Sequence, residues 1–267
     1  MSPRRWFPIL LIVATSVVVA FLALPVLAIF LHTSPARLWD SVGESGSLDD
    51  LKLSLETTAA AIAIIVVFGT PAAYMLATRS FPGKSLIVTL VELPLILPPV
   101  VAGIGMLAAF GPHGLLGGTL HAAGVQLVFQ TAGVIVALVF VASPFYLRQA
   151  QAAFASVDAG YTDASRTLGV GEAGTFARIA VPMARSGLLT GLALAWGRAL
   201  GEFGATLMFA GSVQGVTQTV PLAIYGSFAT DFPSALALSA ILVIVSASLL
   251  ISIRLMSGSW ALGVVAR

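Results

Sequence analysis

Cysteine is absent from this chain of 267 residues, and charged residues make up only 9% of it. The absence of cysteine excludes disulfide bonds, thiolate metal sites and cysteine nucleophiles. The scarcity of charge, together with a hydrophobic fraction of 58% and a mean hydropathy of +1.02, excludes a soluble globular domain. The composition therefore predicts an integral membrane protein.

Signatures of catalysis and nucleotide binding are also missing. The sequence contains no Gly-x-Ser-x-Gly, no Walker-type glycine loop and no His-Glu-x-x-His. No two of the three histidines are four residues apart, so a metal site is not expected at His32, His113 or His121. The basic residues do not form the cluster that nucleic acid binding requires. We therefore expect no enzymatic site, no metal and no resident cofactor on this chain.

Six apolar stretches are each long enough to cross a bilayer, which takes about 20 residues. We expect these spans near residues 6–31, 53–77, 85–110, 125–147, 186–211 and 233–253. The first stretch is too long for a secretory signal and is interpreted as an uncleaved helix. The predicted fold class is all-α and integral to the membrane, with about six transmembrane helices and no second soluble domain of ordinary size.

Basic residues are distributed unequally over the expected loops. One side holds Arg37 and Lys52 only, and the other side holds Arg4, Arg5, Arg79, Lys84, Arg148, Arg166, Arg178, Arg185, Arg254 and Arg267. Loops rich in Lys and Arg remain in the cytoplasm. We therefore expect both termini, and the large loop between the fourth and fifth spans, to be cytoplasmic.

That large loop is the one long polar segment of the chain. Residues at spacings of four, three and four share one face of a short helix: Val157, Tyr161, Ala164 and Leu168. Gly169 is typical of a helix end that needs positive φ. A second helix is expected from near Gly171 up to Pro182, where a new segment should begin. The pattern predicts two short helices joined by a glycine turn outside the membrane.

The spacing in this loop resembles the EAA loop of ABC importer permeases. The matching residues are Asp163, Ala164, Ser165, Gly169, Ile179, Val181 and Pro182. Asp163 stands for the usual glutamate, Ser165 for the second alanine and Val181 for the usual leucine. In that family the loop docks into a cleft on the cytoplasmic ATPase and converts ATP binding into opening of the membrane gate. The alternative is an ordinary amphipathic loop between membrane helices.

The third expected span carries a cluster of helix-breaking residues: Pro94, Pro98, Pro99, Gly103 and Gly105. Interrupted helices are tolerated in a membrane only where protein or water satisfies the freed backbone groups. We therefore place this span beside the transport path. Glu92, in the same span, either lies near the cytoplasmic boundary or makes a polar contact to the loop after the fourth helix.

Arg198 and Glu202 lie in the fifth expected span, where a charge at the bilayer centre costs about 2.5–3.5 kcal/mol on insertion scales. Four residues apart on one helix face, they can neutralise each other. Either they form a structural pair that fixes helix packing, or they line or gate a polar path between two copies of the chain. Gly197, Gly201 and Gly204 share a face that allows close helix packing.

Four longer segments look like the molybdate and tungstate permeases of type I ABC importers: residues 69–74, 93–103, 217–225 and above all 198–211. This resemblance extends from about residue 53 to residue 254. It implies a type I ABC importer transmembrane domain with a cytoplasmic coupling helix. The candidate path or gate residues are Arg198, Gly201, Glu202, Gly204 and Thr206.

The resemblance also implies partners and a location. We expect a homodimer of this chain in the cytoplasmic (inner) membrane of a prokaryote, two cytoplasmic ABC ATPase subunits that hold ATP and Mg, and an external oxyanion-binding protein. The implied activity is ATP-driven inward transport of molybdate or tungstate. The chain then divides into an N-terminal helix with an external loop (1–52), the ABC permease domain (53–254) and a short cytoplasmic tail (255–267).

Other functions remain open at this point. Sulfate and thiosulfate permeases share the Gly-Glu-aromatic-Gly core, and sulfate is a tetrahedral dianion like molybdate. A proton-coupled secondary transporter would use Arg198 and Glu202 as a relay and would need no ATPase, but the docking loop argues against it. An intramembrane hydrolase would need a buried nucleophile with a base, and the expected spans offer none.

Overall fold

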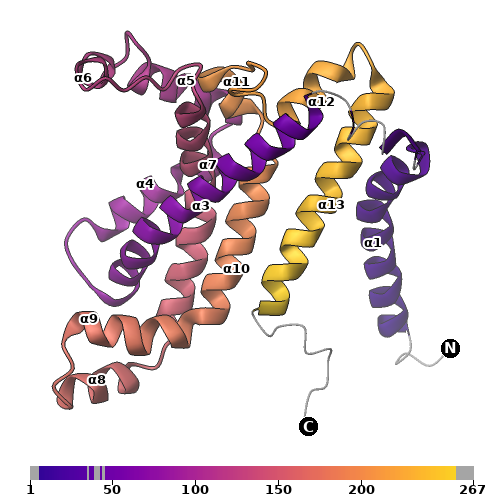
Figure 1. The fold of residues 1–267 in the computed structure, drawn as a ribbon. Helices are drawn as coiled ribbons and strands as arrows, with labels where there is room; N and C mark the ends of the chain where they lie inside the picture. The colour runs from indigo at the N-terminus through magenta and orange to yellow at the C-terminus, as the bar shows by residue number, and fades with distance from the viewer. Residues whose placement is uncertain (1–5, 35, 39–42, 44–45, 257–267) are drawn as a thin grey trace.

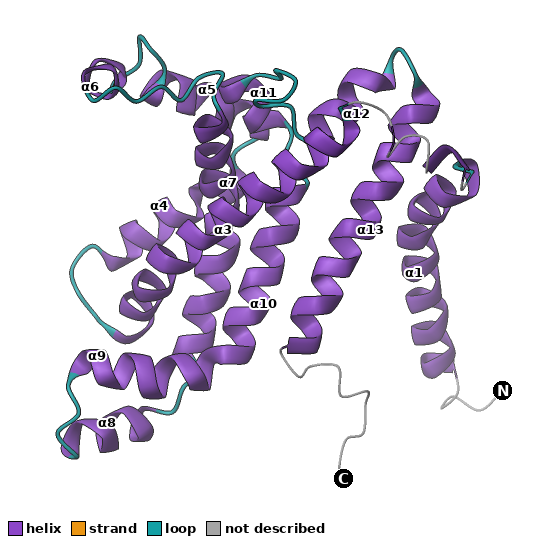
Figure 2. Ribbon diagram, viewed as in Figure 1, coloured by secondary structure: helices purple, strands orange, loops and turns teal. Residues whose placement is uncertain are grey.

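The protein is described by a computed structural model, which places residues 6–34, 36–38, 43 and 46–256. The described residues form helices joined by loops and contain no strand (Figure 1, Figure 2). The expected all-α membrane fold is therefore confirmed. Some residues used in the topology argument lie outside the described residues, namely Arg4, Arg5 and Arg267, as does the tail from residue 257 onward.

The helices follow one another with short connections. In chain order they are α1 (Trp6–His32), α3 (Ser47–Thr78), α4 (Lys84–Ile96), α5 (Pro99–Phe110), α6 (Gly117–Ala122), α7 (Thr131–Ala155), α8 (Ala159–Thr167), α9 (Glu172–Thr175), the π-helical turn η1 (Phe176–Ala180), α10 (Val181–Leu200), α11 (Gly204–Ala210), α12 (Val220–Phe228) and α13 (Phe232–Met256). Helices α8 and α9 lie at one end of the molecule, and α6, α11 and α12 lie at the other (Figure 1). We call these the α8 end and the α12 end.

Five helices of the described chain are long and apolar enough to cross a membrane, and the number of spans is six if the bent pair α4 and α5 counts as one. The prediction of about six spans is confirmed. The bend between α4 and α5 is 119°. It falls at the predicted prolines because Pro98 pushes Leu97 into an extended conformation, and Pro99 then starts a new helix without needing a hydrogen-bond acceptor.

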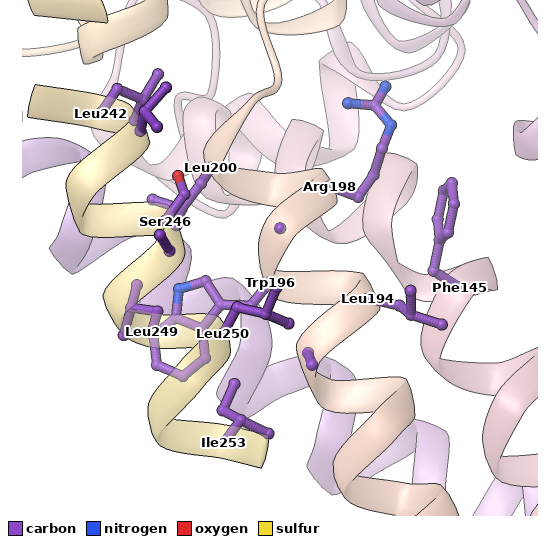
Figure 3. A pocket seen from close by; sticks show the side chains of 14 residues that line it. Phe145, Leu194, Trp196, Arg198, Leu200, Leu242, Ser246, Leu249, Leu250 and Ile253 are labelled. Carbon is purple, nitrogen blue, oxygen red and sulfur yellow. The ribbon is translucent and has the colours of Figure 1, made fainter. Parts of the chain in front are cut away.

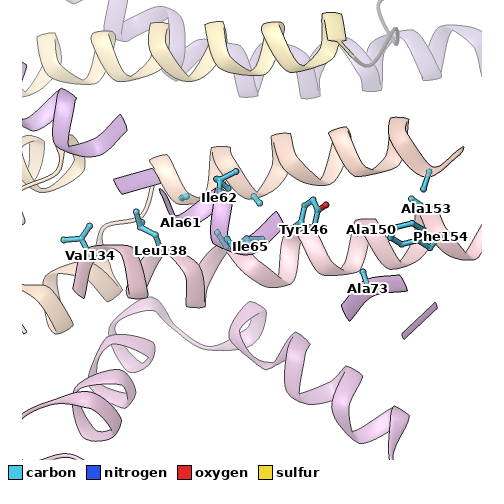
Figure 4. Close-up of a cluster of buried hydrophobic side chains, with 14 of the residues drawn as sticks. Ala61, Ile62, Ile65, Ala73, Val134, Leu138, Tyr146, Ala150, Ala153 and Phe154 are labelled. Carbon is cyan, nitrogen blue, oxygen red and sulfur yellow. The ribbon is translucent and has the colours of Figure 1, made fainter. Parts of the chain in front are cut away.

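Helices α3, α7 and α10 pack together at the centre of the molecule. Their contact surfaces are rich in alanine, which allows the helices to approach closely. The buried cluster includes Ala61, Ile65 and Ala73 from α3 and Leu138 and Ala150 from α7 (Figure 4). By contrast, α1 packs against α13 and has no buried residue, as expected for a helix that faces lipid.

Several helix boundaries differ from the sequence-based expectation, and two of these differences lie beside the large loop. The fourth span was expected to end near residue 147, but α7 continues to Ala155. The second short helix was expected to end before Pro182, yet the chain stays helical from residue 172 to residue 200. The π-helical turn explains this, because Val181 N–H bonds to the Phe176 carbonyl and Pro182 needs no donor in the turn that follows.

The fifth expected span is also interrupted, and the prediction of one continuous helix over residues 186–211 was wrong. Helix α10 ends at Leu200, and α11 begins at Gly204. The three residues between them include Glu202. The break matters for function because two of the candidate path residues, Gly201 and Glu202, lie in it.

Close packing of α5 on α11 gives a first prediction. A Cβ added at Gly103 would lie 2.6 Å from Met208 Cβ and 2.8 Å from the Ala205 carbonyl oxygen, whereas one added at Gly105 would meet no described atom within 4 Å. We expect Gly103→Ala to destabilise the protein by about 1–3 kcal/mol. Gly105→Ala, the matched control, should be neutral or slightly stabilising. Thermal unfolding in detergent checks this, and equal midpoints for the two variants would contradict the packing.

Candidate functional site

Helices α8 and α9 form a hairpin that projects from the α8 end of the bundle (Figure 1). We call residues 158–175 the α8–α9 hairpin. Asp158 caps α8, because its carboxylate accepts a hydrogen bond of 2.8 Å from the Gly160 N–H. The turn between the helices contains Gly169 with φ +81°, the conformation that glycine adopts most easily. The predicted pair of short helices with a glycine turn is confirmed.

Buried hydroxyl groups hold the two helices of the hairpin together. Ser165 Oγ and Thr175 Oγ1 are 3.0 Å apart, and both residues are buried. Of the other matching residues, Asp163, Ala164 and Pro182 are exposed, whereas Ile179 and Val181 are half-buried. Among the motif residues, Ser165 therefore holds the two helices of the hairpin together, and the others are at least partly accessible from outside.

Charged side chains form a network on the surface of the hairpin. Arg166 Nε contacts Glu172 Oε1 at 3.0 Å, and Arg166 Nη1 contacts Asp163 Oδ1 at 2.9 Å. Glu172 Oε2 in turn contacts Arg79 Nη2, at the end of α3, at 3.0 Å. The hydrogen bond that Arg166 donates to Glu172 is the largest cause that raises the pKa of the Arg166 guanidinium. The network links the hairpin to a residue far away in the sequence.

Large apolar side chains on the hairpin are exposed. Tyr161 is 58% exposed and Leu168 is 83% exposed. Both belong to the helix face that the spacing of apolar residues indicated. An apolar patch of this kind, bordered by charged residues, is typical of an interaction surface.

Arg198 and Glu202 form the predicted ion pair through Arg198 Nη2 and Glu202 Oε2. They do not lie on one continuous helix, since Glu202 follows the end of α10. The Glu202 side chain is only 1% exposed, and its other oxygen accepts a hydrogen bond of 2.7 Å from the Ala205 N–H at the start of α11. Both carboxylate oxygens are thus used within the chain, and Glu202 stabilises the break between α10 and α11.

The predicted glycine face is only partly used within one chain. A Cβ at Gly204 would lie 2.9 Å from Pro99 Cβ, so α11 packs closely on the start of α5. At Gly197 a Cβ would meet no described atom within 4 Å, and at Gly201 only the Gly197 carbonyl lies near, at 3.6 Å. Thr206 is fully buried, and its hydroxyl has no hydrogen-bond partner among the described residues.

A cavity of about 680 Å³ lies between α10 and α13 beside this ion pair (Figure 3). Its lining is largely apolar. Trp196 reaches from α10 toward α13, whereas the Arg198 guanidinium points away from α13 (Figure 3). The indole N–H of Trp196 is buried and has no partner within the described part of the chain. The α10 surface therefore has an open apolar side and a positively charged side.

Residues 69–258 match the family described as binding-protein-dependent transport system inner membrane component, which is more than half of the chain. The chain belongs to this family. It is a multi-pass membrane permease of the ABC importer class, in agreement with the resemblance found from the α8–α9 hairpin motif.

Two relatives of this permease are named as permeases of molybdenum and sulfate transport systems. The molybdenum transport system permease protein ModB of Mycobacterium tuberculosis is 40% identical over 235 residues, which cover 88% of this chain and 89% of that protein. The sulfate transport system permease protein CysW of Synechocystis is 31% identical over 244 residues, covering 88% of each. The sulfate permease is therefore the more distant of these two.

A solved structure shares the fold of this permease. The crystal structure of a bacterial ABC transporter that imports the acidic polysaccharide alginate matches with a TM-score of 0.74, over 97% of both chains, at 17% identity. At this identity the likeness concerns the fold alone. The expected architecture, a type I ABC importer transmembrane domain, is confirmed.

Some residues of the permease that form the site were not singled out by the sequence. Glu172 and Thr175 lie outside the motif, and Arg79 is 93 residues from Glu172. The contact between Arg79 and Glu172 depends on the packing of α3 beside the hairpin, which no local pattern reveals. For Glu92, one of the two interpretations is supported: its carboxylate lies 3.7 Å from Arg148 Nε, which the longer α7 carries.

The Glu202 contacts of the permease give a second prediction. Glu202→Gln keeps an oxygen for the Ala205 N–H but removes the charge that faces Arg198, and we expect a loss of about 1.5–3 kcal/mol in unfolding free energy. Glu202→Ala should cost about 1 kcal/mol more, because the helix cap is lost as well. Chemical denaturation in detergent measures both. If the Gln and Ala variants unfold at the wild-type midpoint, the carboxylate does not hold the break.

Proposed function

We propose that this chain is the membrane-spanning subunit of an ATP-driven importer that carries molybdate or tungstate inward across the cytoplasmic membrane. The observation that carries the proposal is the α8–α9 hairpin. Asp163, Ala164 and Ser165 of the docking motif lie on α8 and Gly169 lies in the turn, while Ile179, Val181 and Pro182 follow in η1 and at the start of α10. The chain is also 40% identical to a molybdenum permease over most of its length. A secondary transporter would have no use for such a hairpin.

In this proposal the α8–α9 hairpin enters a cleft on a cytoplasmic ATPase subunit. Tyr161 and Leu168 would lose their exposure to water there, which favours binding. The ATPase subunits would hold ATP and Mg, and this chain would contribute no catalytic site and no cofactor. Described basic residues gather at the α8 end, which supports its cytoplasmic position and that of both termini: Arg79, Lys84, Arg148, Arg166, Arg178, Arg185 and Arg254.

Two copies of the chain would enclose the path. The open surface at Gly197 and Gly201 supports this, because an exposed glycine surface allows close approach of a second helix. Arg198 would then face the cargo dianion, while Glu202, whose oxygens are both used, would position Arg198 and the break. Gly204 and Thr206 would shape the adjoining wall. The permease domain would comprise residues 53–254, after an N-terminal segment (1–52) and before a cytoplasmic tail (255–267).

An external binding protein would deliver the cargo and determine most of the specificity, because a path must bind its cargo weakly enough to release it. Sulfate is the second candidate cargo, supported by the 31% identity to a sulfate permease. Molybdate is favoured over sulfate by the higher identity to a molybdenum permease.

Reconstitution tests the cargo. The chain is placed in liposomes with the ATPase and the binding protein encoded beside it, and ATP hydrolysis and uptake are compared for molybdate, tungstate and sulfate at equal concentration. We expect stimulation by molybdate and tungstate and little by sulfate. Stimulation by sulfate alone would change the cargo, and uptake that is independent of ATP would overturn the mechanism.

The glycine turn of the hairpin gives a further prediction. Gly169→Val places a β-branched residue at φ +81°, which strains the turn, whereas Gly171→Val is made at φ −66° in open space and serves as the matched control. We expect the Gly169 variant to transport several-fold less cargo per ATP hydrolysed. The Gly171 variant should transport normally. Normal coupling in both variants would contradict the docking role of the hairpin.

A further inference from the structure

The α8–α9 hairpin is joined through the chain to α7 and α10, but it also contacts a third helix, α3. The contacts lie at the end of α3 nearest the hairpin. Arg79, the residue that follows the last turn of α3, is bound to Glu172, and Tyr74 lies one turn earlier. These contacts are independent of chain connectivity and join residues about a hundred positions apart.

The first contact is aromatic. The rings of Tyr74 and Phe176 are 4.9 Å apart, and both pack near Phe154, at 5.3 Å and 6.2 Å respectively. Phe176 opens the π-helical turn that follows the hairpin. Three elements, α3, α7 and η1, thus meet through one ring each. Aromatic contacts of this kind contribute about 0.5–1.5 kcal/mol each beyond their buried area, so movement of η1 is opposed unless α3 moves as well.

The second contact is ionic. Glu172 accepts from Arg166 on α8 through both carboxylate oxygens and from Arg79 on α3 through Oε2, and Arg166 also contacts Asp163. Isolated pairs at such exposed positions stabilise a protein little. The geometry of this network is nevertheless specific, because guanidinium groups from α3 and α8 meet at the one carboxylate of Glu172. The network therefore affects the relative position of α3 and the hairpin more than it affects the stability of the protein.

Helix α3 is well suited to transmit a displacement. It is one unbroken helix of 32 residues, about 48 Å long at about 1.5 Å per residue. Near its other end, Ser54 Oγ accepts a hydrogen bond of 2.8 Å from the Val220 N–H, the first residue of α12. Both Ser54 and Val220 are buried. The same helix therefore touches the hairpin at one end of the molecule and α12 at the other.

We propose that α3 is a transmission helix that carries movement of the α8–α9 hairpin to α12, with Glu172 and Phe176 as positioning residues at one end and Ser54 at the other. This inference rests on the proposed ATPase-coupling function of the hairpin. It assigns to α12 the role of the segment that moves at the external side when ATP binds. The covalent route through η1 and α10 then works in parallel with a non-covalent route through α3.

A reporter on α12 tests the inference directly. The chain has no cysteine, so Ala229→Cys, at the exposed end of α12, supplies a single labelling site. In the reconstituted complex, we expect ATP to change the rate at which a thiol reagent labels this cysteine. Glu172→Ala, Phe176→Ala and Ser54→Ala should each reduce that change several-fold, and Ser54→Ala, which lies far from the hairpin, should copurify with the ATPase as the wild type does.

Control variants separate transmission from general damage. Arg148→Ala breaks the pair with Glu92, which joins α7 to α4 and does not touch the hairpin, and it should leave the ATP-dependent change intact. Phe176→Tyr keeps the ring contact and should retain the change that Phe176→Ala loses. In addition, the double variant with Arg79→Ala and Glu172→Ala should reduce the labelling change no more than the stronger of the two single variants. Both substitutions remove the same interaction between Arg79 and Glu172.

The outcomes are distinct. If uptake by the wild-type complex is ATP-dependent but the Glu172, Phe176 and Ser54 variants keep the full labelling change, the transmission role of α3 is wrong and the proposed function stands. Additive losses for Arg79→Ala and Glu172→Ala would overturn the assignment of Glu172 as the link to α3. If the wild-type complex shows no ATP-dependent uptake, the proposed function itself fails.

Discussion

Backbone hydrogen bonding in a medium without water is the constraint on which the rest of this structure depends. A bilayer offers no partner to a freed N–H or C=O group, so each interruption of a transmembrane helix must be satisfied by the protein. The chain interrupts its helices at Leu97, at the π-helical turn and at Glu202. At Leu97 the next helix begins with proline, which lacks a donor. The π turn keeps its backbone groups bonded at a wider spacing, and at the third break the Glu202 carboxylate accepts a hydrogen bond from the Ala205 N–H.

These interruptions also position the site. The bend before Pro99 places the start of α5 where Gly204 of α11 packs against it, so the first and third interruptions meet. Arg198 reaches the same region from the last turn of α10. The π turn, in contrast, lies where the α8–α9 hairpin joins the bundle. Structural irregularity is thus concentrated at the two places to which the proposed function assigns the membrane path and the contact with the ATPase.

The sequence predicted features that depend on local chemistry. Apolar length predicted the spans, prolines predicted the bend, and residue spacing predicted the hairpin and its glycine turn. It did not predict the break at Glu202, because Arg198 and Glu202 fit the four-residue spacing of a continuous helix equally well. The capping of α11 by Glu202 and the contact of Arg79 with Glu172 depend on how helices pack, which a single sequence does not contain. Gly197 and Gly201 match the expected face but pack against nothing in the described chain.

The ion pair of Arg198 with Glu202 and the ion pairs of Glu172 differ in how far they are removed from water. Glu202 is removed from water, and Arg198 and a backbone N–H replace its solvation, so breaking that arrangement has a direct cost in stability. Glu172 is exposed and would be solvated without its arginines. Its pairs therefore add little to stability but still favour one relative placement of α3 and the hairpin. An exposed link of this kind can rearrange during each transport cycle at low energetic cost, which a buried pair such as Arg198 and Glu202 cannot do.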